Sequence, residues 1–303
     1  MNKIKRMIKT TYFGKLLISY FHCIESRILP RIISDEKAVR LYYYRKTGKK
    51  LDLNSPKSFS EKLNWYKLND KKQLMEKCAD KIDVREYVRS CGFGSCLNDV
   101  FGVYSKINDI DVRKLPSKFV IKAAHGSHMN IIVKDKKEIN WFKAKLMMQS
   151  WLMQDIYWSG REWVYKNLKK RILVEKYLED ESGELRDYKF FCFNGEPCYM
   201  QYDCGRYSGR HIRNYYDMDL KLLSIQDSMT EMVDVGLPLE VDSFKKMKNI
   251  AKTLSSPFQF VRVDLYLVKQ HIYFGEMTFF DGGGYSGFDE ETDMEFGKKW
   301  KLI

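Results

Sequence analysis

The chain has 303 residues, of which 44% are hydrophobic and 15% aromatic, so it can bury the core of one multi-layer unit or of two to three small subdomains. Its formal net charge of +13 favours anionic partners such as nucleotide phosphates, acidic polysaccharide and acidic lipid. The basic residues are scattered and no DNA- or RNA-reading motif is present, which argues against nucleic acid as a partner.

The N-terminal segment is basic and contains a short apolar run, Leu16–Ile24. The run is far too short to span a membrane, and no small-residue cleavage site follows it. Two alternatives remain: a helix that lies on acidic lipid at the inner face of the membrane, or a helix packed on the core. The seven cysteines have spacings unlike those of zinc sites or disulfide frameworks. A cytoplasmic protein, with at most peripheral membrane contact, is therefore expected.

Capping residues and apolar periodicity predict helices over residues 34–48, 58–68 (capped by Ser60), 74–90, 141–169 and 242–254. In the helix at 74–90, Lys77 and Lys81 fall on one face. Alternation predicts strands over 99–104, 118–123, 129–134, 172–178, 187–193, 197–203 and 213–217. This order mixes antiparallel strands with helices and lacks βαβ regularity, so the predicted fold class is α+β.

The segment Phe260–Phe280 reads as two alternating strands joined by a polar turn at Lys269–His271. Arg262 and Asp264 share a face of the first strand, and Glu276 and Thr278 fall together on the second. An arginine and two carboxylates on the open face of a hairpin suit a Mg²⁺–nucleotide platform. The alternative is a half-exposed sheet with ordinary surface charges.

The pattern Arg262-x-Asp264 followed by Glu276-x-Thr278 resembles the C-terminal signature of ATP-grasp enzymes, in which the last residue is usually Asn. Three upstream segments resemble that superfamily in the expected order: Ala79-Asp80-Lys81, Phe119–Lys122 with Gly126-Ser127, and Leu173–Leu178. From about residue 35 to its end the chain resembles the TupA-like ATP-grasp family of bacterial surface-polysaccharide proteins.

The resemblance implies two α+β subdomains that clasp ATP, preceded by a mainly helical region. The expected boundaries are 1–72 for the helical region, 73–171 for the small subdomain with its phosphate-binding lysines, and 172–303 for the subdomain with the metal site.

The resemblance also implies site residues. ATP is expected to contact Lys81, Lys122, Gly126, Ser127, Glu175, Lys176 and Leu178, and Mg²⁺ is expected on Asp264, Glu276 and Thr278. Arg262 and Lys189 are the expected catalytic residues. Alternatives stay open for the three lysines. A carboxylate partner is the alternative for Lys122, and a solvated position on a helix is the alternative for Lys81. Lys189 is equally compatible with pairing to Asp187 or to a neighbour in the sheet.

The acceptor is expected to contact Arg206, Arg210 and Arg213, whose planar forks suit a carboxylate, and Gly283 and Gly284, where backbone can approach a ligand closely. A solvated basic loop and a flexible glycine loop are the alternatives.

The resemblance implies an ATP- and Mg²⁺-dependent carboxylate–amine ligase that acts through an acyl phosphate. Its expected substrates are an amino acid or similar amine and a sugar-acid carboxylate of capsule, O-antigen or a teichuronic-type polymer. One rival is a glycosyltransferase of the same pathways, whose Asp-x-Asp motif is matched only formally by Asp217-Met218-Asp219. Another is a non-catalytic basic protein that docks on membrane or nucleic acid.

Overall fold

The computed structural model describes residues 11, 14–18, 20, 32–206, 209–225, 232–285 and 287–303. The chain divides into two compact units. Unit 1 comprises the described parts of Met1–Val39, with Asp80–Ile82 and Asp99–Tyr177, and unit 2 comprises Arg40–Ala79, Asp83–Asn98 and Leu178–Ile303. The predicted boundaries at 72/73 and 171/172 remain predictions.

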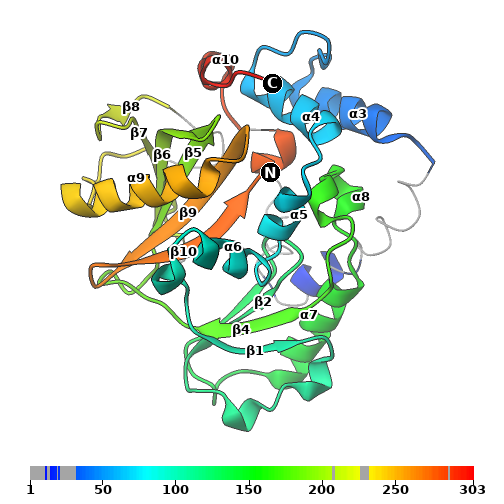
Figure 1. Ribbon diagram of the computed structural model, residues 1–303. Coiled ribbons are helices and arrows are strands. Elements are labelled where there is room, and N and C mark those ends of the chain that lie inside the picture. The colour runs from blue at the N-terminus through cyan, green and yellow to red at the C-terminus, as the bar shows by residue number, and fades with distance from the viewer. Residues whose placement is uncertain are drawn as a thin grey trace. The chain divides into compact units, whose positions relative to one another are not determined.

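Unit 1 is built on a four-stranded antiparallel sheet in the order β1-β4-β2-β3 (Figure 1). The strands are β1 Val100–Tyr104, β2 Phe119–Ala123, β3 Asn130–Val133 and β4 Ile172–Lys176. Helix α7 (Trp141–Met153) buries Met148 and Trp151 in one core with Phe119, Ile121 and Val174. Short helices α8 (Tyr157–Gly160), η2 (Ile107–Asp109), η3 (Val112–Lys114) and η4 (Trp163–Tyr165) complete the unit.

The predicted helix over 141–169 is wrong in its second half. Gln154 is extended and ends α7, and Arg161 is left-handed at φ 55° after the single turn of α8. The buried Arg161 guanidinium donates to Asp35 at 2.8 Å, so an ion pair holds this bend in place of a longer helix.

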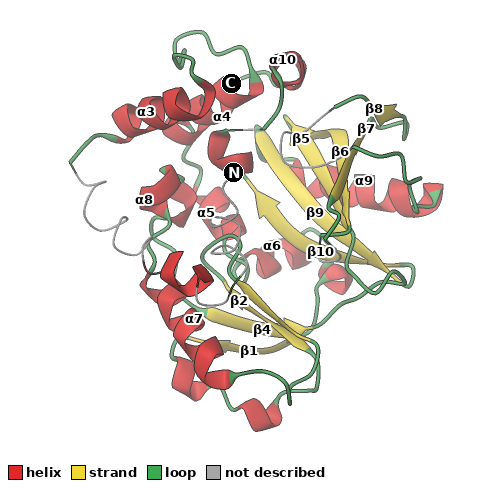
Figure 2. Cartoon of the chain, turned by 180° about the vertical axis from the view of Figure 1, so that it is seen from behind, coloured by secondary structure: helices red, strands yellow, loops and turns green. Residues whose placement is uncertain are grey.

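Unit 2 contains a six-stranded antiparallel sheet in the order β10-β9-β5-β6-β7-β8 (Figure 2). Its strands are β5 Asp187–Phe193, β6 Glu196–Cys204, β7 Ile212–Tyr216, β8 Leu222–Leu223, β9 Phe260–Val268 and β10 His271–Thr278. Helix α9 (Val241–Ser255) covers one face, where Phe244 stacks on Phe190 with centroids 6.1 Å apart. The predicted strands over 187–193, 197–203 and 213–217 and the predicted helix over 242–254 are therefore confirmed to within two residues.

The opposite face of this sheet is aromatic at one end. Phe59 of α4 (Phe59–Asn69) meets Phe191, Phe193 and Phe260 of the sheet and Phe296 of α10 (Glu290–Lys299). Since strand side chains alternate between faces, Arg262, Asp264 and Lys189 continue this same face beyond the aromatic end. The aromatic cluster thus anchors the strands that carry the predicted site.

Two helix predictions need correction. Helix α4 is capped by Ser58, which forms a capping box with Glu61, whereas Ser60 donates to Asp293 at 2.9 Å. The predicted helix at 74–90 is two helices, α5 (Gln73–Ala79) and α6 (Val84–Ser90). Asp80 breaks it, because its carboxylate accepts the backbone N–H of Ile82 at 2.7 Å and competes with helical bonding.

The predicted hairpin is confirmed, with a shorter turn than expected. Lys269 and Gln270 both have positive φ, 48° and 63°, as a two-residue turn requires, and His271 already belongs to β10. Helix α3 (Asp35–Thr47) confirms the predicted segment at 34–48, and η1 (Gly94–Cys96) and η5 (Asp281–Gly284) are short turns. The mixture of helices and antiparallel sheets confirms the α+β class.

Of the apolar run Leu16–Ile24, only Leu16–Ile18 and Tyr20 belong to the described residues; the rest, like Cys23, lies outside them. No helix in the described part of the chain has the length and apolar character needed to cross a bilayer.

Candidate active site

The hairpin of unit 2 brings the predicted metal and catalytic residues together. Across β9 and β10, Asp264 pairs with Glu276, and Arg262 pairs with Thr278. The register shifts at Gly275, where an added Cβ would lie 2.9 Å from the carbonyl oxygen of Asp264. On the other side of β9, Lys189 of β5 lies opposite Asp264. One carboxylate therefore has a cation on its own strand and another on the neighbouring strand.

Asp264 is only 1% exposed, and basic groups contact both of its carboxylate oxygens. Arg262 donates Nε–H to Oδ1 at 2.7 Å and an Nη–H to Oδ2 at 2.8 Å, and the Lys189 ammonium donates to Oδ2 at 2.6 Å. Burial alone lowers the pKa of Lys189, but Asp187 and Asp264 overcome this effect and raise it. Likewise, Asp264 and Asp281 raise the pKa of Arg262 far above its ordinary value in spite of its burial. Both side chains are thus held in their charged forms although they are buried.

Arg262 also links the other polar groups of the hairpin. It donates to Thr278 Oγ1 at 3.3 Å, lies 3.8 Å from Glu276 Oε1, and is paired with Asp281 directly after the hairpin. The side chain of Glu276 is 34% exposed, so it is the more open carboxylate of the pair. Among the described residues no group of three His, Cys, Asp or Glu side chains forms a ready metal cage.

A second charged group continues across the sheet from Lys189. The Lys189 ammonium lies 3.2 Å from Asp187, and Arg206 bridges Asp187 at 2.9 Å and Asp203 at 3.0 Å. The predicted acceptor residues Arg206 and Arg213 are therefore already paired with carboxylates, since Arg213 donates Nε–H to Asp203 at 2.7 Å; Arg210 is exposed.

Asp203, which sequence reasoning missed, is the centre of this second group and is fully buried. Burial raises its pKa, but the hydrogen bond from His211 and the positive charge of Arg213 outweigh burial and hold the pKa well below 3.8. Gln201 and Asp203 share a face of β6, as Asp187 and Lys189 share a face of β5. This alternation was the signal in the sequence that could have identified Asp203. What alternation could not supply was the register that places these strands side by side.

The glycine segment after β10 is held by helix α4. Gly282, Gly283 and Gly284 have φ of 56°, 69° and 86°. Lys67 donates to the carbonyl of Gly283 at 2.5 Å, and Asn64 donates to that of Gly284 at 2.7 Å. A Cβ on Gly284 would lie 2.9 Å from Asn64 Oδ1, so this glycine is required by packing as well as by φ. These contacts disagree with a freely flexible surface loop.

In unit 1, Lys122 of β2 forms an ion pair with Glu175 of β4, so the carboxylate alternative left open for this lysine describes its state here. Lys81 lies in the turn between α5 and α6 rather than on a helix face. Its ammonium donates to the carbonyl of Gly126 at 2.7 Å. The loop after β2 is thereby tied to the first predicted lysine segment.

The remaining residues that were predicted to contact ATP lie in this loop, at the end of β4 or shortly after it. Ser127 is exposed, Lys176 lies 3.2 Å from Asp99, and the half-buried Leu178 opens the last segment of unit 2. His125 is buried with Nε2 3.0 Å from the carbonyl of Trp151, and burial lowers its pKa. His125 therefore packs inside unit 1 and stabilises this loop, and its ring is not exposed to a ligand.

The formal Asp-x-Asp match has a local structural role. Asp217 Oδ1 accepts the backbone N–H groups of Asp219 and Lys221, each at 2.9 Å, in the turn between β7 and β8. Asp217 thus stabilises a turn, as Asp commonly does at such positions.

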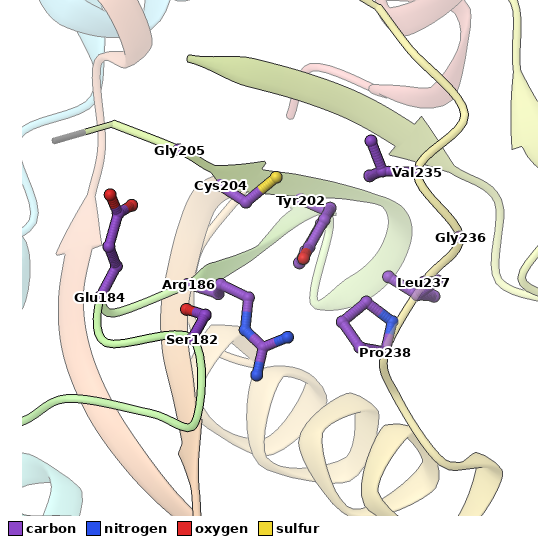
Figure 3. Close-up of a pocket in the computed structure, with 10 residues that line it drawn as sticks. All are labelled: Ser182, Glu184, Arg186, Tyr202, Cys204, Gly205, Val235, Gly236, Leu237 and Pro238. Carbon is purple, nitrogen blue, oxygen red and sulfur yellow. The ribbon is translucent and has the colours of Figure 1, made fainter. Parts of the chain in front are cut away.

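A cavity of about 550 Å³ lies elsewhere in unit 2 (Figure 3). Arg186 and Tyr202 point into it, and Val235, Leu237 and Pro238 form the facing wall. Tyr202 alternates with Asp203 on β6, so this cavity belongs to the α9 face of the sheet. None of the predicted site residues lines it.

Residues 61–301 match the sequence model of a known family, TupA-like ATPgrasp. No curated protein matches the chain. Similar solved structures include the D-alanine–D-alanine ligases of Helicobacter pylori (11% identity, 82% of this chain and 70% of that chain, TM-score 0.44) and Bacillus anthracis (14%, 74% and 67%, 0.43). Another is N5-carboxyaminoimidazole synthase of Aspergillus clavatus in complex with ADP and 5-aminoimidazole ribonucleotide (10%, 68% and 45%, 0.40).

Proposed function

We propose that this chain, which belongs to the TupA-like ATP-grasp family, is an ATP-dependent ligase that forms a C–N bond between an amine and a sugar-acid carboxylate. The acceptor carboxylate attacks the γ-phosphate of ATP, the bond between the β- and γ-phosphates breaks, and ADP leaves. The amine nitrogen then attacks the acyl phosphate, the amide bond forms, and phosphate and one proton are released. The substrates proposed are an amino acid or similar amine and a uronic-type sugar of a bacterial surface polysaccharide.

The observation that carries this proposal is the Asp264 cluster. Two cations, Arg262 and Lys189, meet a buried carboxylate next to the more open carboxylate of Glu276. Such a set suits phosphoryl transfer, in which catalysis consists almost entirely of positioning and charge stabilisation. Arg262 stabilises the charge that develops on the transferred group, and Lys189 holds a phosphate oxygen.

The donor set of the hairpin fits Mg²⁺. Asp264, Glu276 and Thr278 offer only oxygen ligands, and Mg²⁺ commonly takes one or two carboxylates and completes its shell with water and phosphate. When bound, the ion neutralises the phosphate charge that the acceptor carboxylate has to approach. Arg262 and Lys189 keep the Asp264 carboxylate oriented through their hydrogen bonds to its oxygens.

The nucleotide contacts proposed for unit 1 rest on Lys122 and the loop at Gly126 and Ser127. When ATP binds, the Lys122 ammonium leaves Glu175 and pairs with a phosphate oxygen. Lys81 holds the loop in place through its hydrogen bond to the carbonyl of Gly126. The strand end at Glu175 and Lys176, followed by Leu178, receives the adenine. These assignments use the family resemblance together with the observed ion pairs.

The acceptor is proposed to lie along the arginines of the second charged group and the glycine segment. Arg206 and Arg213 border the same sheet face as Lys189, and Arg210 is exposed beside them. Gly283 and Gly284 continue directly from the metal strand. Because ATP is a cytoplasmic substrate, the reaction is placed in the cytoplasm, with the acceptor free or held at the inner face of the membrane.

The test is an ADP-release assay on the purified protein with uronic acids and amino acids, with and without Mg²⁺. We expect ADP only when both an acid and Mg²⁺ are present, and a hydroxamate when hydroxylamine replaces the amine. ATP-independent release of a nucleoside diphosphate from a sugar nucleotide would instead identify a glycosyltransferase. Absence of ATP binding and of any turnover would favour a non-catalytic docking protein.

A further inference from the structure

His211 and Asp203 form a dyad in unit 2 that the mechanism above does not use. His211 immediately precedes β7, and its Nε2 lies 3.1 Å from Asp203 Oδ1. The carboxylate can only accept a hydrogen bond, so Nε2 carries the proton that is donated. Nδ1 of the neutral ring is then the basic nitrogen. The His211 side chain is 29% exposed whereas Asp203 is fully buried, so the buried partner orients a ring that solutes can reach.

Asp203 is held in place as a charged group. Besides His211, it accepts from Arg213 at 2.7 Å, from Arg206 at 3.0 Å and from Gln201 at 2.8 Å. The charged side chains near the ring among the described residues are Asp203 on β6, Arg213 on β7, and Arg206 and Arg210 on the segment between these strands. A carboxylate fixed by so many donors cannot swing away, and the histidine tautomer it selects is therefore fixed as well.

The dyad shares a sheet face with the Asp264 cluster. Asp203 pairs with Asp187, and Lys189, two residues further along β5, pairs with Asp264. Two strand spacings sideways and two residues along a strand place the Cα atoms of Asp203 and Asp264 about 12 Å apart. Lys189 and Asp187 lie between the two groups, so the dyad borders the same charged sheet face as the residues proposed to hold the transferred phosphate.

Amide formation from an acyl phosphate requires such a group. An aliphatic amine is mainly an ammonium ion at neutral pH and has no lone pair until it loses a proton. When its nitrogen attacks the carbonyl, a C–N bond forms, the C–O bond to phosphate breaks, and a proton has to leave the nitrogen. Lys189 and Arg262 already donate hydrogen bonds to Asp264, so neither side chain is placed to accept this proton.

We propose that His211 is the general base of the ligase, with Asp203 as its positioning residue: Nδ1 takes the proton from the attacking amine. The inference rests on the proposed ligase function. It goes beyond that function by assigning the second half-reaction to a specific nitrogen atom, and by making a primary or secondary amine the nucleophile. A ring nitrogen that carries no proton and is held in place next to the attacking amine can act as such a base.

The test compares two nucleophiles in His211→Gln. Hydroxylamine is largely unprotonated at neutral pH and attacks acyl phosphates without help from a base. The variant should keep hydroxamate formation within about twofold of wild type and lose about 10²- to 10⁴-fold in amide formation, the usual contribution of a general base.

His271→Gln is the matched control. This exposed histidine at the start of β10 contacts the carbonyl of Ser95 at 3.0 Å and belongs to neither charged group, so both rates should stay at the wild-type level. Equal loss of hydroxamate and amide in His211→Gln, or no loss of either, overturns the base assignment. A wild-type protein that forms no hydroxamate with any acid overturns the ligase proposal itself, and the inference with it.

Discussion

Replacing the two carboxylates of the hairpin one at a time should separate catalysis from stability. Asp264→Asn and Glu276→Gln are both expected to abolish Mg²⁺-dependent ADP release, because each removes one charged oxygen donor of the proposed site. Their effects on folding should differ. Asp264 is buried against Arg262 and Lys189, whereas Glu276 is one-third exposed and lies 3.8 Å from Arg262.

The size of the difference follows from burial. Removing the charge of Asp264 leaves two buried cations with reduced compensation, which costs about 3–5 kcal/mol, whereas loss of a partly exposed pair at the distance of Glu276 costs about 1 kcal/mol or less. For a domain of this size about 1 kcal/mol shifts the melting temperature by about 2–4 °C. We therefore expect Asp264→Asn to melt about 6–20 °C below wild type, and Glu276→Gln within about 4 °C of it.

Thermal melting followed by circular dichroism, with ADP release on the same samples, measures both effects. Asp219→Asn is the control, since Asp219 is exposed in the β7–β8 turn of the same unit, and it should change neither quantity. Equal melting temperatures for the two hairpin variants would refute the buried-charge reasoning. Wild-type turnover in either of them would remove the metal assignment. Loss of turnover in Asp219→Asn would revive the Asp-x-Asp alternative.

Substitutions at three further positions and one pH dependence follow from the same contacts. Lys122→Ala should weaken binding of a non-hydrolysable ATP analogue about ten- to hundredfold, because it deletes a charge-assisted contact of about 1.5–3 kcal/mol; an unchanged Kd in calorimetric titration would exclude the lysine from the phosphate site. Arg213→Ala should cost about 2 kcal/mol in urea unfolding, and Arg213→Lys should recover little of it, since an ammonium cannot reproduce the contacts of Nε and Nη with Asp203 at 2.7 and 3.4 Å. Gly284→Ala should lower the melting temperature, because its Cβ would meet Asn64 at a backbone φ of 86°; unchanged melting would show that the segment moves freely. The pKa of Asp203 is depressed in the folded state, so its contribution to stability is complete above its unfolded pKa of about 4. That contribution is lost as the pH falls through the folded pKa. In Asp203→Asn, the free energy of unfolding should therefore fall less steeply with decreasing pH than in the wild type.

The sequence by itself determined the hairpin, the order of the strands along the chain and the α+β class. Alternation is a local property of strands, so spacing alone assigned the four polar residues of the hairpin to their faces. The family resemblance likewise depends on short motifs in a fixed order, and these can be recognised in the sequence without knowing their contacts. The predictions of helix ends and of breaks within helices were wrong. At Asp80, for example, a side chain competes with the backbone for a single hydrogen bond.

Only the tertiary structure decided which charges meet. Lys189 lies opposite Asp264, Asp203 gathers Arg206, His211 and Arg213, and α4 holds the glycine segment more than 200 residues away in sequence. These partners are set by strand register and by the bulge at Gly275, neither of which leaves a periodic signal in the sequence. The physical reason is that a buried charge has to find its counter-charge in space, and the chain position of that partner is free to vary.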